Sequence, residues 1–218
     1  MPIEFEGVRI SWLGHDAFRL KDEKTIYIDP YRIKGKEAAD VILVTHEHFD
    51  HLSVEDINKI SSERCVIVAA RPCAGQLARV RAKEIKYVKP GDELEVEGIR
   101  IKAVPAYNTT KFREPGRPFH PKDAGGVGYV VTMKGISIYH TGDSDFIPEM
   151  RGLKVDVLLV PVSGTYVMTA EEAASAANAI MPRLAIPMHY GTIVGSEKDA
   201  EHFKRLAKCE VRIPTRED

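Results

Sequence analysis

Four side chains that commonly bind metal ions fall within six residues, directly after an apolar run. The run Val41–Val44 is short and continuous, which is typical of a strand buried on both faces. The next segment, residues 45–51, reads THEHFDH and carries three histidines and an aspartate. Imidazole and carboxylate ligands together suit zinc, iron, manganese or nickel. The segment therefore predicts a metal site at a strand end rather than a solvated polar turn.

Composition restricts the class of protein further. The chain has 218 residues, of which 44% are hydrophobic and 29% charged, and this predicts one globular domain over residues 1–218. The net charge of −1 gives no general attraction for nucleic acid. The longest apolar stretch, residues 157–162, is too short to span a membrane, and the amino-terminal residues lack signal-peptide character. A cytoplasmic protein without a membrane partner is expected.

Two features of rarer residues add to this. None of the three cysteines forms a C-x-x-C pair, so a thiolate zinc site is not indicated. One glutamine and three asparagines stand among many lysines, arginines and glutamates, a balance typical of proteins from thermophiles.

Short strands are expected in both halves of the chain, with helices late in each half. Helices are predicted over 54–60 with Ser53 as N-cap, after Pro72, over 170–179 with Thr169 as cap, and over 196–207. The segment 108–126, rich in proline, glycine and charge, is expected to be a loop. The strands are expected at 8–12, 17–20, 25–28, 41–44, 66–69, 85–88, 93–96, 99–104, 127–133, 136–140, 157–160 and 184–186. This order favours two packed sheets covered by helices.

Two further candidates for metal binding also follow predicted strands. Asp143 comes just after the strand that begins at Ile136, and a carboxylate there can bridge two cations through its two oxygens. His189 follows the buried strand 184–186. Read alone, either residue could instead be an ordinary turn aspartate or a buried histidine.

In this order, the H-x-H-x-D-H element, Gly142-Asp143 and His189 resemble the metallo-β-lactamase superfamily. The chain looks like its small branch of metal-dependent hydrolases, which includes ascorbate-6-phosphate lactonase-like members. The segments WLGH (12–15), IDP (28–30), TGD (141–143) and IPMH (186–189) carry this closer likeness. The resemblance implies an α+β fold, a four-layer αββα sandwich of two mixed sheets, with a dinuclear site at one edge.

The resemblance also implies a ligand set. His46 and His48 would bind the first metal, Asp50, His51 and His189 the second, and Asp143 would bridge. Up to two divalent ions per chain are expected, with zinc favoured and manganese, iron or nickel as alternatives.

One ligand of the family pattern is missing. The third histidine of the first site should follow the strand that ends at Val104, but Asn108 stands there. Asn108 could bind through its amide oxygen, His15 could replace the lost nitrogen, or the first site could be weak. His120, on the long loop, could contact substrate or replace a ligand. His140 could orient a ligand or simply pack, and Asp29 is expected to brace the site.

A shared metal pair predicts hydrolysis as the reaction. Two cations lower the pKa of a shared water from about 15.7 toward about 7, giving a metal-bound hydroxide at neutral pH. Asp50 would aim this hydroxide as well as hold its metal, and Tyr190, next to His189, would donate a hydrogen bond to the substrate.

The surroundings of the site suggest a small anionic substrate. Residues 108–124 carry Lys111, Arg113, Arg117 and Lys122, which suit a phosphodiester or a phosphate-bearing lactone, although the loop charges could be merely solvated. One alternative is a non-catalytic metal or ligand sensor, suggested by Asn108 at a histidine position. A nuclease is less favoured because the chain has no net positive charge. A closed structural metal site fits poorly, because the ligand set exceeds four.

Overall fold

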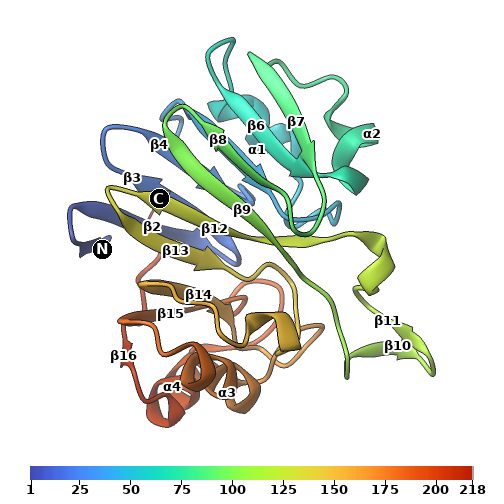
Figure 1. The fold of residues 1–218 in the computed structure, drawn as a ribbon, viewed down its shortest axis with the longest axis vertical. Coiled ribbons are helices and arrows are strands. Elements are labelled where there is room, and N and C mark those ends of the chain that lie inside the picture. The colour runs from blue at the N-terminus through green and yellow to red at the C-terminus, as the bar shows by residue number, and fades with distance from the viewer. Residues whose placement is uncertain (218) are drawn as a thin grey trace.

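The computed structural model describes residues 1–217, and its main feature is a pair of facing sheets (Figure 1). Among these residues, each of the two large sheets has seven strands. The first sheet contains, in spatial order, β1 (Ile3–Phe5), β2 (Val8–Gly14), β3 (Ala17–Lys21), β4 (Thr25–Ile28), β5 (Val41–Val44), β6 (Val66–Ala70) and β7 (Glu84–Val88). The second contains β16 (Glu210–Val211), β15 (Leu184–Met188), β14 (Val157–Pro161), β13 (Ile136–His140), β12 (Val127–Met133), β9 (Ile99–Pro105) and β8 (Glu93–Val96).

Both sheets are mixed, with an antiparallel part and a parallel part. Strands β1 to β4 pair antiparallel, whereas β4 to β7 pair parallel. In the second sheet β8, β9, β12 and β13 are antiparallel and β13 to β16 are parallel. Since parallel strands end at the same edge of a sheet, the segments that follow β13 and β15 emerge together.

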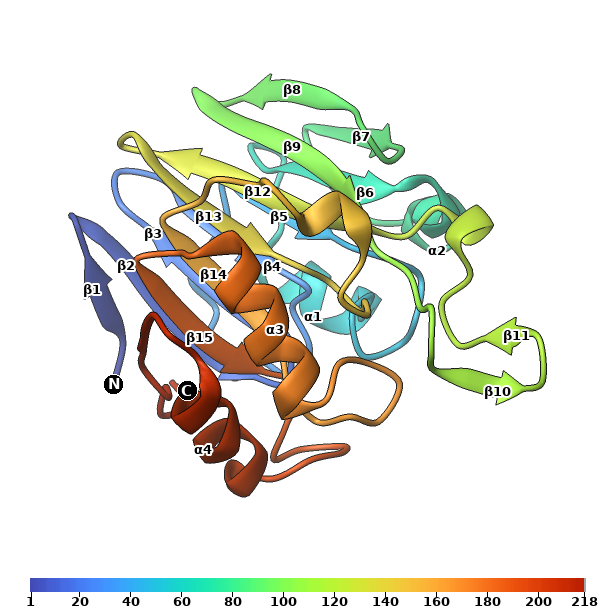
Figure 2. The same cartoon turned by 60° about the horizontal axis from the view of Figure 1, so that its bottom comes forward.

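The helices lie outside the sheets. They are α1 (Val54–Ile60), α2 (Ala74–Leu77), α3 (Ala170–Ile180) and α4 (Glu197–Leu206), with short 3-10 turns η1 (Arg71–Cys73), η2 (Lys122–Ala124) and η3 (Pro148–Met150). Helices α3 and α4 cover the second sheet near β14 and β15, and α1 lies on the first sheet (Figure 2). The predicted α+β architecture of two packed mixed sheets covered by helices is confirmed.

The helix starts follow the expected capping chemistry. Ser53 accepts a hydrogen bond from the Asp56 backbone N–H at the start of α1. Thr169 and Glu172 form a reciprocal capping box at the start of α3. The helix expected after Pro72 is only a short turn, made of η1 and α2.

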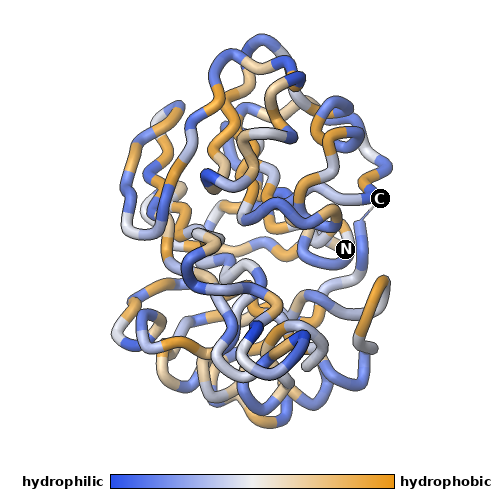
Figure 3. Tube along the Cα trace, turned by 90° about the vertical axis from the view of Figure 1, so that its right-hand side faces the viewer, coloured by the Kyte–Doolittle hydropathy of each residue, from blue (hydrophilic) through white to orange (hydrophobic). Residues whose placement is uncertain are grey.

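One continuous apolar core joins the two sheets. All four residues of β5 are fully buried, as their uninterrupted apolar pattern predicts. Figure 3 shows hydrophobic segments alternating with hydrophilic ones along the chain. The prediction of one domain over residues 1–218 stays a prediction.

The long loop is more ordered than its composition predicts. It carries a small hairpin, β10 (Phe112–Glu114) and β11 (Arg117–Pro118), that projects from the sandwich (Figure 2). Asp145 fixes the base of this loop, because its Oδ2 accepts hydrogen bonds from the backbone N–H groups of Thr109 and Thr110, both at 2.6 Å.

Within the described part of the chain, every helix is too short or too polar to cross a lipid bilayer. The cytoplasmic location expected from the sequence stays a prediction.

Candidate metal centre

Chain segments that are distant in sequence bring possible metal ligands to one edge of the sandwich. They are the segment after β5, the turn after β13, the end of β15, the turn between β2 and β3, and the long loop. The donor atoms form three overlapping groups, and within each group they lie within 4.8 Å of one another. The groups are His46, His48 and His120; His46, His51 and Asp143; and His15, Asp16, His51 and His189.

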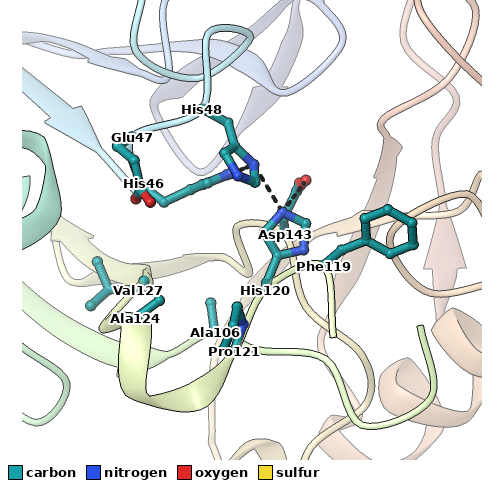
Figure 4. A pocket seen from close by; sticks show the side chains of 11 residues that line it. His46, Glu47, His48, Ala106, Phe119, His120, Pro121, Ala124, Val127 and Asp143 are labelled. Atoms are coloured by element: carbon teal, nitrogen blue, oxygen red, sulfur yellow. Dashed lines mark hydrogen bonds and ion pairs between the residues drawn. The ribbon is translucent and has the colours of Figure 1, made fainter. Parts of the chain in front are cut away.

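The first group consists of three imidazoles that face one another. His48 Nδ1 lies 3.0 Å from His46 Nε2 and 3.1 Å from His120 Nε2. His46 and His120 are buried, and Figure 4 shows all three rings turned to a common point beside Asp143. For ligands about 2.0–2.1 Å from a tetrahedral zinc ion, neighbouring donor atoms are roughly 3.3–3.4 Å apart. The spacing of the three nitrogens therefore suits a shared metal ion.

The third histidine of this group comes from the long loop and is oriented by Asn108. The amide oxygen of Asn108 accepts hydrogen bonds from the backbone N–H and the ring Nδ1 of His120, at 2.8 and 2.9 Å. The amide nitrogen of Asn108 donates to Asp145 Oδ1 at 3.2 Å and to the Tyr166 carbonyl at 2.9 Å. These contacts point the Asn108 oxygen at His120, which places Asn108 to orient that ring, and the ligand role predicted for Asn108 stays a prediction.

Asp143 lies between the first group and two further histidines. Its Oδ1 is 3.3 Å from His51 Nε2, and its Oδ2 is 3.3 Å from His120 Nε2 and 3.5 Å from His189 Nε2. Its Oδ1 thus faces His51, while its Oδ2 faces His120 and His189. A carboxylate between histidines of both groups is placed to bridge two ions.

The outer nitrogens of the two further histidines are held by hydrogen bonds. His51 Nδ1 lies 2.7 Å from Asp29 Oδ2, and Thr45 Oγ1 donates to the same oxygen at 2.6 Å. His189 Nδ1 lies 2.9 Å from Ser163 Oγ. Such outer contacts fix the ring orientation and leave Nε2 available to a metal. Asp29 therefore braces the site, as the sequence suggested.

Several inner atoms of the cluster are buried without a hydrogen-bond partner. Within the described residues, these include His51 Nε2, His189 Nε2 and Asp143 Oδ1. Their contacts are ion pairs of 3.3 and 3.5 Å between His51 or His189 and Asp143, which are long for hydrogen bonds. Buried polar atoms are nearly always hydrogen-bonded in folded proteins, so this cluster of donor atoms favours a bound cation. Imidazole and carboxylate donors fit a borderline divalent ion.

Electrostatics divide the histidines into two kinds. Burial and the neighbouring His51 hold the pKa of His46 well below its ordinary value, and burial lowers the pKa of His120 to about 4.

Burial also opposes protonation of His51 and His189, but the charges of nearby carboxylates outweigh this effect of burial. Asp143 and Asp29 hold the pKa of His51 well above its ordinary value, and Asp143 and Asp16 raise the pKa of His189 to about 9. Burial alone would raise the pKa of Asp143, but His51 and His189 hold it well below its usual range.

Asp50 lies at the mouth of the site rather than inside it. It belongs to none of the three donor groups, and its side chain is 14% exposed. Its Oδ2 lies 3.1 Å from His15 Nε2. Burial alone would raise the pKa of Asp50, but this hydrogen bond and the charge of His51 lower it to about 2. The ligand role predicted for Asp50 remains a prediction.

The β2–β3 turn contributes a second carboxylate that the sequence reading missed. Asp16 is fully buried, and its Oδ2 lies 3.4, 3.5 and 3.8 Å from the Nε2 atoms of His15, His51 and His189. The available signal was its place next to His15, directly after the strand and its turn glycine. His15 itself lies between Asp16 and Asp50.

His140 connects two of the turns that carry possible ligands. Its Nε2 donates to the Asp16 carbonyl at 2.9 Å, and its Nδ1 accepts from the Gly142 N–H at 3.1 Å. This histidine therefore positions the backbone of both turns.

Tyr190 is not brought to the cleft. Its ring stacks on Trp12, with 4.9 Å between ring centroids, and burial and the carboxylates of Glu197 and Glu201 raise its pKa. Neither pocket beside the histidines has Tyr190 in its lining. Its ring thus packs behind His189 and away from both pockets, and the catalytic contact predicted for this hydroxyl stays a prediction.

An open cleft of about 410 Å³ leads to the cluster. His48, His120, Asp143 and Asp50 lie in its lining, beside Arg113 and an apolar wall of Phe49, Phe119, Tyr166 and Ile193. A smaller pocket of about 30 Å³, drawn in Figure 4, reaches the same three residues His48, His120 and Asp143 from the side of Glu47. The candidate ligands are thus accessible to a small molecule.

Comparison with known proteins agrees with this geometry. Residues 9–189 match the beta-lactamase superfamily domain. The chain belongs to the metallo-β-lactamase superfamily, as the resemblance in its sequence predicted.

Within this superfamily the chain is similar to proteins named UPF0173 metal-dependent hydrolases. It is 35% identical over 216 residues to one from Thermoplasma acidophilum, covering 93% of this chain and 92% of the relative. It is 35% identical over 213 residues to one from Methanopyrus kandleri, covering 91% and 90%.

Solved structures show the same fold. The crystal structure of a candidate metal-dependent hydrolase from Parabacteroides distasonis superposes with a TM-score of 0.84 at 32% identity, covering 98% of both chains. A metallo hydrolase from the hyperthermophilic archaeon Ignicoccus hospitalis shares the fold with a TM-score of 0.76 at 21% identity, covering 97% and 96%. Relatives from thermophiles agree with the low amide content of this chain.

Proposed function

We propose that this member of the superfamily hydrolyses a small ester that carries an anionic group, either a phosphodiester or a phosphate-bearing lactone. Its class, a metal-dependent hydrolase, follows from the family and from relatives at about 35% identity. The observation that carries the proposal is that His48, His120 and Asp143 meet in the lining of an open cleft, with buried His46 beside His48 and His120.

The metal that the site fits would be a divalent ion, and two ions per chain are proposed. His46, His48 and His120 would hold one ion, and His51 and His189 would hold the other, with Asp143 between them. Bound there, such ions supply a nucleophile from water at neutral pH and neutralise charge on the attacked group. Zinc is the first choice for this donor set, with manganese, iron and nickel as alternatives.

Asp50 is proposed to orient the attacking water. Its depressed pKa of about 2 keeps it anionic at neutral pH, and it lines the cleft beside Asp143. Because His15 Nε2 lies 3.1 Å from its Oδ2, one oxygen is held in place while the other remains able to accept a proton or a hydrogen bond.

The substrate class is argued from the one loop cation that remains available. Three of the four cations on the loop are paired at 2.7 Å: Lys111 with Glu172, Arg117 with Glu114, and Lys122 with Glu149. Arg113 has no carboxylate partner in the described part of the chain, lines the cleft, and lies 5.4 Å from the centroid of the Phe119 ring. A planar guanidinium beside an apolar wall suits a phosphate or carboxylate attached to an apolar group.

The cleft volume favours a small molecule over a polymer. About 410 Å³ lies within the range typical of sites for small ligands. With a net charge of −1, the chain has no overall attraction for nucleic acid. A non-catalytic sensor was the alternative because Asn108 stands where the family pattern has a histidine. His120 lies beside His46 and His48 and is proposed to supply the third imidazole, so this observation no longer favours a sensor.

The proposal is tested by assaying metal-loaded protein on bis-aryl phosphates, phosphorylated lactones and uncharged esters. Turnover is expected for an anionic ester, and Asp143→Ala should reduce it by at least about 100-fold, because residues that only support metal ligands already contribute about 10- to 100-fold and Asp143 is proposed as a ligand. Folding of the variant is checked by circular dichroism. Equal turnover by the two proteins, or activity confined to uncharged esters, would argue against the proposal.

A further inference from the structure

We infer that Asp16 is a metal ligand in this chain, and that it takes the place in the second site that the family pattern gives to Asp50. The inference rests on the proposed metal centre but not on any choice of substrate. Asp16 and Asp50 both lie beside His15, but under this inference only Asp16 binds the metal. Asp16 faces the buried donors, and Asp50 faces the cleft.

Asp16 is buried at the inner end of the donor cluster. Its side chain is 0% exposed, and neither carboxylate oxygen meets a hydrogen-bond donor within the described residues. An isolated carboxylate in such a place is unfavourable, so buried acidic groups are paired or bound to metal. Asp50 differs on both points, since it is 14% exposed and has a hydrogen bond to His15.

The Asp16 carboxylate lies close to the Nε2 atoms of two histidines. Its Oδ2 lies 3.5 Å from His51 Nε2 and 3.8 Å from His189 Nε2. Donor atoms about 2.0–2.2 Å from a tetrahedral ion are separated by roughly 3.3–3.6 Å. Asp16 therefore stands near the separation expected of ligands on one ion, and it forms a four-residue donor group with His15, His51 and His189.

The imidazole rings of His51 and His189 both direct Nε2 toward the Asp16 carboxylate. Asp29 and Ser163 occupy the Nδ1 atoms of His51 and His189, at 2.7 and 2.9 Å. The Nε2 atoms of both rings have no hydrogen-bond partner among the described residues. A cation between them would satisfy both nitrogens and the Asp16 carboxylate together.

The turn that carries Asp16 is held in place before any ion binds. His140 Nε2 donates to the Asp16 carbonyl at 2.9 Å. The His15 carbonyl accepts from the Trp12 indole at 2.8 Å and from the His189 backbone N–H at 3.1 Å. His15 has a φ of 53°, a conformation that few residues other than glycine adopt, and these bonds maintain it. Positioning of this kind is typical of a built ligand site.

The rival explanation is that Asp16 only balances the charge of protonated histidines. The two roles differ in metal content. Wild-type protein, Asp16→Asn and Asp50→Asn are each loaded with zinc, passed through a desalting column with a weak chelator, and analysed for metal per chain. We expect two ions in the wild-type protein and in Asp50→Asn, and one in Asp16→Asn. Two ions in Asp16→Asn, or the loss confined to Asp50→Asn, would overturn the inference.

A spectroscopic variant decides the case if Asp16→Asn does not fold. Asp16→Cys and its matched control Asp50→Cys are loaded with Co²⁺, and the wild-type protein supplies the background of Cys65, Cys73 and Cys209. A thiolate bound to Co²⁺ adds a strong near-ultraviolet charge-transfer band. The band is expected in Asp16→Cys alone, and its appearance in Asp50→Cys alone contradicts the assignment. Wild-type protein that holds no ion would instead contradict the proposed function.

Discussion

The amide oxygen of Asn108 receives both the backbone N–H and the ring Nδ1 of His120, at 2.8 and 2.9 Å. This relationship explains how a chain with asparagine at an expected histidine position still assembles three imidazoles. The ring nitrogen that faces Asn108 carries the proton, so His120 Nε2 keeps its lone pair for a metal.

Removing this contact should weaken the first metal site. Asn108→Ala leaves His120 without its orienting acceptor and is expected to lower zinc affinity of the first site by about 10- to 100-fold. His120→Ala should abolish that site. Asn58→Ala, at an exposed position of α1, is the matched control and should change nothing. Competition with a chromophoric chelator measures the affinities, and an unchanged affinity in Asn108→Ala would refute the orienting role.

Metal binding should release protons at the second site, which contains His51 and His189, and few protons at the first site. The pKa of His189 is raised to about 9 and that of His51 is well above its ordinary value, so both are protonated at pH 7 without metal. His120, with a pKa of about 4, and His46 are already neutral. Affinity of the second site should therefore rise by about tenfold per pH unit for each displaced proton between pH 6.5 and 9, with little change at the first.

Calorimetry in two buffers of different ionisation enthalpy measures this proton release. The stability of metal-free protein gives an independent check. A raised pKa in the folded state contributes stability that is complete below about pH 6.5, the value of an unfolded histidine, and is lost as the pH rises through about 9. Proton release that is the same for both equivalents of metal would contradict the assignment.

Gly142 should be intolerant of a side chain. It has a φ of 61°, and an added Cβ would lie 2.8 Å from the Val127 carbonyl oxygen. Gly142→Ala should cost about 1–2 kcal/mol for the backbone conformation and about 1–3 kcal/mol more for the clash. Gly152→Ala, at a φ of 81° with open space around it, should show only the first cost. Urea unfolding of metal-free protein measures both, and equal losses would show that the clash is relieved.

Arg113 should govern the preference for anionic substrates. Arg113→Gln is expected to lower kcat/KM by about 10- to 100-fold on an anionic ester, the usual effect of losing a hydrogen bond to a charged group, and to spare an uncharged ester. Arg117→Gln removes a cation already paired with Glu114 and should leave both activities nearly unchanged. If Arg113→Gln and Arg117→Gln have the same kcat/KM on the anionic ester, Arg113 does not bind the anionic group.

The part of the site that follows strand ends could be predicted from sequence. His46, Asp143 and His189 come directly after apolar strands, and strands that end at one edge bring such residues together. The strands of the two sheets and the caps at Ser53 and Thr169 were predicted for similar local reasons, whereas the family was predicted from the resemblance of its motifs.

The rest depends on contacts that no local pattern reveals. His120 reaches the site only because Asn108 and Asp145 fix the path of a long loop. Asp16 reads as an ordinary turn residue, and it is buried only once the second sheet covers the β2–β3 turn. Tyr190 adjoins His189 in sequence, but neighbouring residues at a strand end point in different directions, and its ring turns to Trp12.

The proposed metal centre holds a pair of divalent ions between His46, His48, His120, His51, His189 and Asp143. Elemental analysis of protein purified without added metal or chelator, beside Asp143→Ala, measures this occupancy. We expect close to two ions per wild-type chain and a clear loss in the variant. Wild-type protein without bound metal, or the same metal content in both proteins, would contradict it.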